Sequence, residues 1–312
     1  MKKLLIATLA LLCFLMLDSE RATAQQDAEY TQYMFNSLVL NPAYAGSRDA
    51  LSATAIYRHQ WAGMDGAPRT LSLGGHSPIG DRVGVGLFLE NDRIGVHNRF
   101  SLFGSYAYKI PVAADGNLSL GLQAGILSYA SNWANLPNIQ DPTDPNFQGQ
   151  QSKLLPNFGI GAYYYTDRYY VGLSVPHLLA NNLDDISPQA KQYMHYFLTG
   201  GMVFDINSDL KLKPSILIKH VPSLSPLEAD LNVSLLFRDA LWVGMGYRTA
   251  DALLFLLEYQ FPTGLRIGYS YDLTLTKLSG FNSGSHEIML GIDLDTGSGG
   301  NSIQKVLSPR YF

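Results

Sequence analysis

Runs of about ten residues, in which apolar side chains alternate with small or polar ones, fill most of the chain after residue 25. In one run Leu118, Leu120 and Leu122 alternate with Ser119 and Gly121. A period of two is typical of a β-strand with two different faces, and strands of roughly 9–11 residues can cross a bilayer at a tilt. The pattern predicts fourteen strands, at residues 50–60, 69–77, 82–90, 98–110, 117–129, 156–166, 168–176, 191–205, 209–219, 228–238, 240–248, 252–261, 264–273 and 284–294.

The connections between these strands fall into two alternating classes. Those that follow odd-numbered strands are mostly long, including 91–97, 130–155 and 177–190, with 249–251 as the short exception. Those that follow even-numbered strands are tight turns rich in Gly, Pro, Asn and Asp. Outer-membrane barrels have short periplasmic turns at one rim and long outer loops at the other. We therefore predict an all-β, antiparallel transmembrane outer-membrane β-barrel of about 14 strands.

The alternation also predicts two chemically different faces for the barrel wall. Large apolar side chains on one face suit lipid, whereas Gly, Ser, Asn and scattered charges on the other suit a lumen. Only 15% of the residues are charged, against roughly 25% in a soluble domain. The inward charges would either pair across a filled lumen or line an open pore. The predicted lumen charges are Lys211, Lys213, Lys219, Arg238, Arg248, Glu258, Arg266, Asp272, Glu287 and Asp293.

The first 24 residues have the three parts of a secretory signal peptide. Lys2 and Lys3 precede an apolar run over 4–17, and Ala22-Thr23-Ala24 supplies small residues before the cleavage point. Cleavage would remove Cys13, the sole cysteine of the chain, and with it any disulfide or thiol chemistry. The predicted organisation is a signal peptide (1–24), a periplasmic N-terminal segment that plugs the barrel or packs at its mouth (25–49), the barrel (50–294) and a periplasmic tail (295–312).

Several function classes are disfavoured by the sequence. The net charge of −4 and the lack of basic runs argue against nucleic acid as a partner. No nucleotide loop, zinc-ligand spacing or nucleophile elbow occurs, so we expect no cofactor, no metal and no enzymatic activity. Asp141 and Asp144 are too few carboxylates for a calcium site. The stretch around them is predicted as a stiff extracellular loop with candidate contact residues Asp141, Pro142, Asp144, Pro145 and Phe147.

A segment before the first strand fits neither a strand nor an amphipathic helix. It contains Tyr-Thr-Gln-Tyr-Met-Phe-Asn at 30–36 and Asn-Pro-Ala-Tyr-Ala-Gly at 41–46. Further along the chain are Tyr-Arg-x-Gln-Trp at 57–61, Pro-Asn-Phe-Gly at 156–159 and Ser-Pro-Arg-Tyr-Phe at 308–312. With these motifs, the mature chain resembles the PorP/SprF family of type IX secretion system outer-membrane proteins over nearly its whole length.

The resemblance implies an integral outer-membrane, non-enzymatic component of type IX secretion. Some family members act with periplasmic or lipoprotein components of the machinery, and others receive the C-terminal sorting domain of a surface adhesin, such as those used in gliding motility. We expect the second role, with loops 130–155 and 177–190 contacting the exported cargo. Candidate contact residues for periplasmic partners are Tyr30, Gln32, Tyr33, Met34, Phe35, Asn36, Asn41, Pro42, Ala43, Tyr44 and Gly46.

We predict an integral outer-membrane location with both termini periplasmic. Two other interpretations remain open from the sequence. A diffusion channel or a transporter for hydrophobic substrates would share the barrel. A secreted soluble β-protein would share the strands but not the sorting of connections by length.

Overall fold

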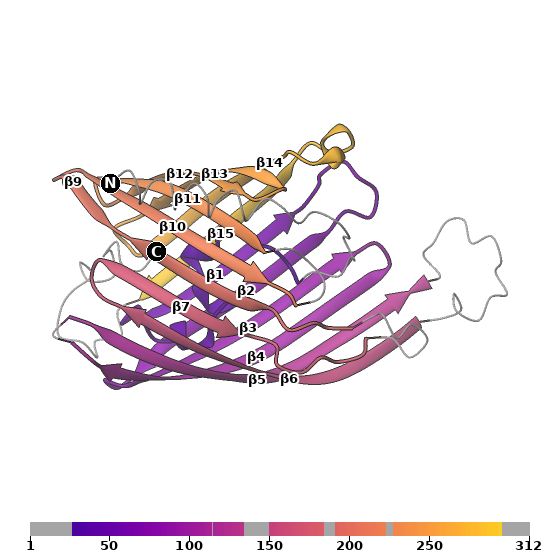
Figure 1. Ribbon diagram of the computed structural model, residues 1–312, viewed down its shortest axis with the longest axis horizontal. Coiled ribbons are helices and arrows are strands. Elements are labelled where there is room, and N and C mark those ends of the chain that lie inside the picture. Colours follow the sequence, from indigo (N-terminus) through magenta and orange to yellow (C-terminus); the bar gives the residue numbers. More distant parts are fainter. Residues whose placement is uncertain (1–26, 114, 134–149, 184–190, 223–226, 295–312) are drawn as a thin grey trace, which may run out of the picture.

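The fold is a closed antiparallel β-barrel (Figure 1). A computed structural model describes residues 27–113, 115–133, 150–183, 191–222 and 227–294. The ring closes where the first and last strands pair, from Leu51 opposite Leu294 to His59 opposite His286. The predicted fold class is therefore confirmed. The signal peptide, the loop residues 141–147 and the tail 295–312 lie outside the described residues.

Fifteen strand segments form a wall of fourteen strands, because β8 and β9 are two parts of one strand interrupted at Val203. The segments are β1 (Leu51–His59), β2 (Arg69–Ile79), β3 (Val83–Ile94), β4 (His97–Pro111), β5 (Asn117–Asn132), β6 (Gln150–Tyr165), β7 (Tyr169–Val175), β8 (Tyr196–Met202), β9 (Phe204–Asn207), β10 (Leu210–His220), β11 (Glu228–Phe237), β12 (Leu241–Arg248), β13 (Ala252–Gln260), β14 (Leu265–Thr274) and β15 (Ser285–Leu294). A short 3₁₀ helix, η6 (Lys277–Gly280), lies between β14 and β15.

The connections define two rims, which we call the long-loop rim and the tight-turn rim. The tight-turn rim carries the connections after β2, β4, β6, β9, β11 and β13, and also the start of β1 and the end of β15. One connection at the long-loop rim was predicted wrongly. The segment 91–97 is not a long loop, because β3 and β4 continue to a turn at Gly95 and Val96. Asp92, in the predicted loop, is a buried lumen residue of β3, as is Glu90 at the end of the predicted strand.

The two faces of the wall differ as the alternation predicts. On β5, Leu122 is 61% exposed on the outside, whereas Gly121 and Gln123 on either side are buried. The same alternation recurs around the ring and leaves a continuous apolar outer surface suited to lipid. Within the described residues, no helix is long and apolar enough to cross a membrane.

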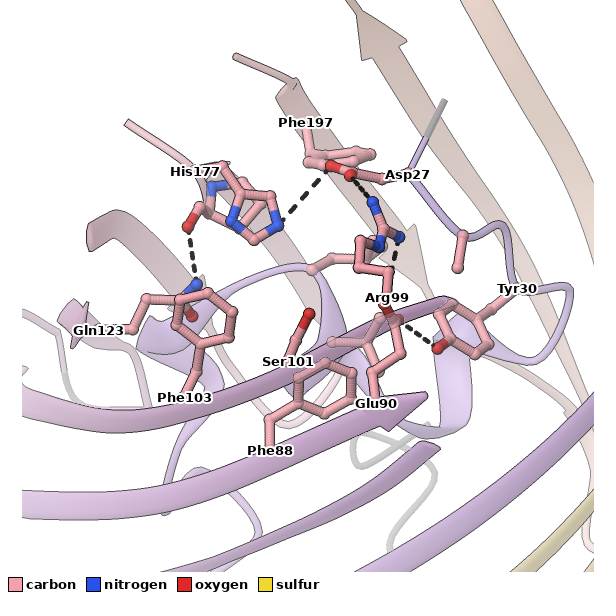
Figure 2. Close-up of a pocket in the computed structure, with 14 residues that line it drawn as sticks. Asp27, Tyr30, Phe88, Glu90, Arg99, Ser101, Phe103, Gln123, His177 and Phe197 are labelled. Carbon is pink, nitrogen blue, oxygen red and sulfur yellow. Dashed lines mark hydrogen bonds and ion pairs between the residues drawn. The ribbon is translucent and has the colours of Figure 1, made fainter. Parts of the chain in front are cut away.

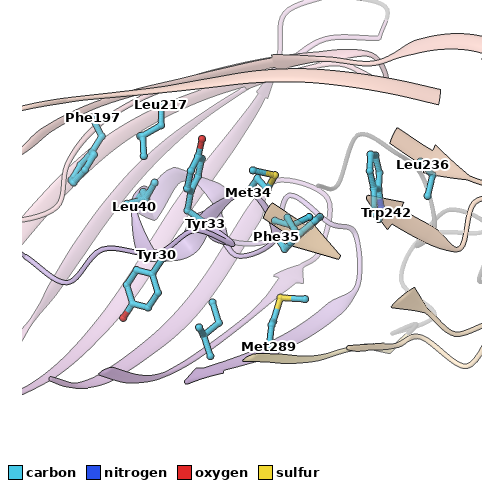
Figure 3. Close-up of a cluster of buried hydrophobic side chains, with 12 residues drawn as sticks. Tyr30, Tyr33, Met34, Phe35, Leu40, Phe197, Leu217, Leu236, Trp242 and Met289 are labelled. Carbon is cyan, nitrogen blue, oxygen red and sulfur yellow. The ribbon is translucent and has the colours of Figure 1, made fainter. Parts of the chain in front are cut away.

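Residues 27–50 thread the interior of the barrel and form what we call the plug (Figure 3). Three 3₁₀ turns shape it, η1 (Tyr33–Phe35), η2 (Ser37–Val39) and η3 (Pro42–Tyr44). Asn41 starts the last turn by accepting a hydrogen bond from the backbone N–H of Ala43, with Pro42 at the first position. The plug begins beside residues of the long-loop rim and leads into β1 at the tight-turn rim.

Candidate functional site in the barrel lumen

The plug supplies the hydrophobic core that the wall alone lacks. Phe35 lies 6.4 Å from Trp242 between ring centroids, and Tyr44 lies 5.4 Å from Tyr163 in an edge-to-face arrangement. The larger cluster joins plug residues to β1, β8, β10, β11, β12, β13 and β15 (Figure 3). Its buried members are Tyr30, Tyr33, Met34, Phe35, Leu40, Ile56, Phe197, Leu217, Leu236, Trp242, Leu256 and Met289.

Inward-facing glycines let the plug backbone touch the wall. A Cβ atom at Gly121 of β5 would overlap the backbone of Pro42 and Ala43, and one at Gly84 of β3 would overlap the carbonyl of Ala45. The small residues on the predicted lumen face therefore leave room for the plug backbone. This close approach explains why the wall needs glycine at these two positions.

Hydrogen bonds fix the middle of the plug to β6 and β7. The side-chain amide of Asn41 donates to the carbonyls of Ala162, at 3.0 Å, and Leu173, at 3.4 Å. The hydroxyl of Ser174 donates to the carbonyl of Leu40 at 2.6 Å. The backbone of a non-regular segment is thus satisfied inside the barrel, as buried polar groups require.

Two wall carboxylates near the long-loop rim hold the first turn of the plug. Glu287 accepts hydrogen bonds from the backbone N–H groups of Thr31 and Gln32, at 3.0 and 2.8 Å. Asp272 accepts one from the hydroxyl of Thr31 at 2.7 Å. Arg58 lies between these carboxylates, 2.7 Å from Asp272 and 3.3 Å from Glu287. We call this the Arg58 cluster, and it joins the plug to β1, β14 and β15.

The start of the plug carries two acidic side chains that meet basic wall residues. Asp27 lies 2.6 Å from Arg99 (Figure 2). It also lies 3.2 Å from His195. Burial alone would raise the pKa of Asp27, but the neighbouring His195, His177 and Arg99 outweigh it and hold the pKa well below its usual range.

Glu29 is anchored in the same way, 3.0 Å from Lys219 and 3.4 Å from Arg248. Burial opposes its ionisation, yet Lys219 and Arg248 lower the pKa of Glu29 to about 2. Asp27 and Glu29 therefore stay charged at neutral pH and remain paired with the wall.

At the opposite end, Arg48 of the plug is paired with a carboxylate near the tight-turn rim. Its guanidinium lies 2.7 Å from Asp293, which also lies 2.9 Å from Arg266. Arg266 in turn donates a hydrogen bond to the carbonyl of Phe35 at 3.5 Å. The plug is therefore held by ion pairs at both ends of the lumen.

Little space remains around the start of the plug. Two cavities of about 40 and 30 Å³ flank the stretch from Asp27 to Tyr30, and Figure 2 shows the first, which Arg99 and His177 help to line. Cavities of this size hold one or a few water molecules. In the described part of the chain, no group of three or more His, Cys, Asp or Glu residues is arranged to hold a metal ion.

Eight of the ten predicted lumen charges lie in the lumen and are buried. They are Lys213, Lys219, Arg248, Glu258, Arg266, Asp272, Glu287 and Asp293. Lys213 makes no ion pair within the described residues, and its ammonium lies 5.5 Å from the ring centroid of Tyr170 and 5.8 Å from that of Trp242.

The two other predicted lumen charges lie at the tight-turn rim. Lys211 is partly exposed and pairs with Asp239. Arg238 does not lie in the lumen, because it is one residue past the end of β11, in a turn with φ +49°, and its side chain is 67% exposed beside Asp209.

The eleven candidate contact residues of the N-terminal motifs all lie in the plug, where they are buried inside the barrel. Contact with a partner at these positions stays a prediction that would require the plug to leave the lumen.

Several residues that hold the plug were not predicted from the sequence, namely Asp27, Glu29, Arg48, Arg58 and Arg99. Alternation could have placed Arg58 inside, since it shares strand parity with the buried Thr54 and Ile56. The plug residues gave no such signal, because their segment has no regular period.

A sequence profile of the family described as "Type IX secretion system membrane protein PorP/SprF" matches residues 22–292. The chain belongs to the PorP/SprF family. This confirms the resemblance in the sequence and shows a type IX secretion outer-membrane barrel. A comparison with curated proteins found no match.

Solved structures of outer-membrane barrels are similar in architecture to this PorP/SprF protein. A KdgM porin is 11% identical, with a TM-score of 0.38, over 77% of this chain and 98% of that chain. A Pseudomonas aeruginosa FadL homologue is 12% identical, with a TM-score of 0.44, over 88% and 96% of the two chains. A TodX mutant described as a monoaromatic hydrocarbon channel is 12% identical, with a TM-score of 0.44, over 82% and 92%. At these values the likeness says nothing about a substrate.

Replacing Arg58 with Gln tests the Arg58 cluster. The change leaves Asp272 and Glu287 buried without their shared counter-charge, which typically costs about 3–5 kcal/mol. Urea unfolding in lipid vesicles should show a loss of this size. Arg238→Gln is the matched control, because its exposed ion pair with Asp209 contributes about 0–1 kcal/mol. Equal unfolding free energies for the two variants would contradict the cluster's role.

Replacing Gly121 with Val tests the fit between plug and wall. The added side chain overlaps the backbone of Ala43, so we expect a loss of about 1–3 kcal/mol and faster proteolysis within the plug. Gly104→Val is the control, because a Cβ atom there points outward and meets only the carbonyl of Ala124 at 3.9 Å. Limited proteolysis of both purified variants makes the comparison, and a plug equally resistant in both would contradict the contact.

Proposed function

We propose that this PorP/SprF protein is a closed, non-enzymatic scaffold that holds an exported surface protein at its long-loop rim and contacts the type IX machinery at its tight-turn rim. The observation that carries the proposal is the plug, since it occupies the lumen from one rim toward the other. A filled barrel of about fourteen strands is suited to binding at its rims, because even open barrels of 16–18 strands are only small aqueous channels.

The length of the connections supports an orientation for the barrel. Short turns are periplasmic in barrels of this class, so we place the long-loop rim outside the cell. The end of β15 then lies on the periplasmic side, as predicted for the C-terminus. Asp27 lies at the other rim, beside Arg99 and His195, so the proposed orientation differs at this end from the periplasmic N-terminal segment predicted from the sequence.

The described flanks of the predicted cargo loops are firmly attached to the wall. Asn157, in the Pro-Asn-Phe-Gly motif, donates a hydrogen bond to the side chain of Gln192 at 2.7 Å and accepts one from the backbone of Leu179 at 3.1 Å. Gln192 donates from its backbone to the carbonyl of Asn181 at 2.8 Å. These bonds support a fixed base for segment 177–190 at the rim where cargo would bind.

A loop replacement on living cells tests the docking role. A Gly-Ser linker in place of residues 134–149 should abolish surface display of the cargo adhesin while the barrel stays at its normal level in the outer membrane. Replacing 277–280 at the same rim is the matched control and should leave display unchanged. Full display with the 134–149 linker, or after deletion of the gene, would contradict the proposal.

Electrical recording separates the scaffold from the channel alternative. The purified full-length protein in planar bilayers should show no stable conductance, because the plug closes the lumen. Stable ionic conductance of the wild-type protein would favour a diffusion channel instead.

A further inference from the structure

A row of basic side chains crosses four neighbouring strands on the outer surface, at the long-loop rim. In the strand register His286 of β15 lies opposite His59 of β1, His59 opposite Arg69 of β2, and Arg69 opposite Arg93 of β3. The four strands are consecutive around the closed ring. We call these four residues the basic row.

The basic row faces outward, toward lipid. On β1 and β2 its members share strand parity with Tyr57, which is 43% exposed, and Leu71, which is 56% exposed. Arg69 and Arg93 are themselves exposed. Among the strand residues that the structure describes, these two are the only Lys or Arg side chains with outward parity.

The two arginines of the row have no acidic partner within the described residues. Arg69 forms no ion pair, and Arg93 donates a hydrogen bond only to the side-chain oxygen of Asn91, at 3.2 Å. Asp65, in the connection before β2, pairs with neither. Exposed arginines at the opposite rim do meet carboxylates, Arg168 at 3.1 Å from Asp205 and Arg238 at 3.8 Å from Asp209.

This arrangement is unfavourable without an anion. Like charges directly opposite each other on neighbouring strands destabilise the pair. A cation on the lipid face also costs free energy, least near the membrane interface, which is where the strand ends place this row. An anionic group between Arg69 and Arg93 would compensate both effects, and guanidinium groups bind phosphate well.

We propose that the basic row binds the phosphate of an outer-leaflet glycolipid, such as lipid A, with the acyl chains lying on the apolar surface below it. Leu71 and Leu73, the next two outward-facing residues of β2 after Arg69, are exposed and provide that surface deeper in the membrane. Tyr271, whose ring centroid lies 5.2 Å from that of His286, suits the level of the headgroups.

The loops above the row are fixed to one another, so the row is preorganised. The backbone N–H of Gly95 donates to the carbonyl of Gly66 at 3.0 Å, which joins the connection after β1 to the turn after β3. Ala62 donates to the carbonyl of Gly284 at 2.8 Å, which joins the same connection to the one before β15. A rigid platform of this kind reduces the cost of ordering on binding.

The inference rests on the orientation in the proposed function and on no other part of it. If the barrel were inverted, the row would face phospholipids of the inner leaflet. Cargo display and conductance are measured independently, so failure of lipid binding would be distinguishable from failure of the scaffold role.

Binding of diphosphoryl lipid A to the purified full-length barrel in detergent tests the proposal, with titration followed by native mass spectrometry. The double variant Arg69→Gln/Arg93→Gln should weaken binding on the order of tenfold or more, because two charge-assisted contacts are lost. The control Arg168→Gln/Arg238→Gln should bind as the wild type does. Dephosphorylated lipid A should bind the wild type as weakly as diphosphoryl lipid A binds the double variant.

Four outcomes would overturn the proposal. They are unchanged binding by the double variant, equal weakening in the control, preference for phosphatidylglycerol over lipid A, and displacement of lipid A by millimolar inorganic phosphate. A heat-resistant folded band on gels verifies folding of each variant. If the double variant does not fold, the single variant Arg93→Gln, near the end of β3, makes the same comparison.

Discussion

Buried ion pairs and hydrogen bonds at the two ends of the lumen link the plug to the wall, and each side needs the other. Near the long-loop rim, Asp272 and Glu287 accept hydrogen bonds from the first turn of the plug while Arg58 balances their charge. Near the tight-turn rim, Asp293 meets Arg48 of the plug. Without the plug, the wall carboxylates would face the lumen with fewer hydrogen-bond donors. Leaving a buried charge uncompensated costs free energy of folding. The ring of strands and the N-terminal segment therefore form one folding unit.

The filled lumen favours a function at the rims and the outer surface, as proposed. Glycines at 84 and 121 bring plug and wall backbones together. What the barrel presents is a tight-turn rim, a long-loop rim and a lipid-facing wall that carries the basic row. In the proposed function the protein acts by what it binds at its rims, and the basic row would further define its lipid environment.

Alternation alone was enough to predict most of the wall, since lipid outside and a polar lumen inside force a period of two on every strand. The failures have local causes. The strand predicted at 82–90 ended too early, because polar residues inside a barrel, such as Asp92, resemble a loop in sequence. Arg238 was assigned inward by extending the strand parity into a turn. The lumen position of the plug could not be read from its own residues. Contacts such as that of Thr31 with Glu287 join positions 256 residues apart, and no periodic pattern in the sequence indicates them.

Backbone hydrogen exchange of the intact barrel tests most directly the central claim that the plug, residues 27–50, is docked inside the lumen. The account predicts that amides such as those of Thr31, Gln32 and Ala43, which donate to buried side chains, exchange about as slowly as those of the wall strands. Exchange of the plug amides at the rate of the exposed turn at Asp167 and Arg168, while the strands stay protected, would contradict it.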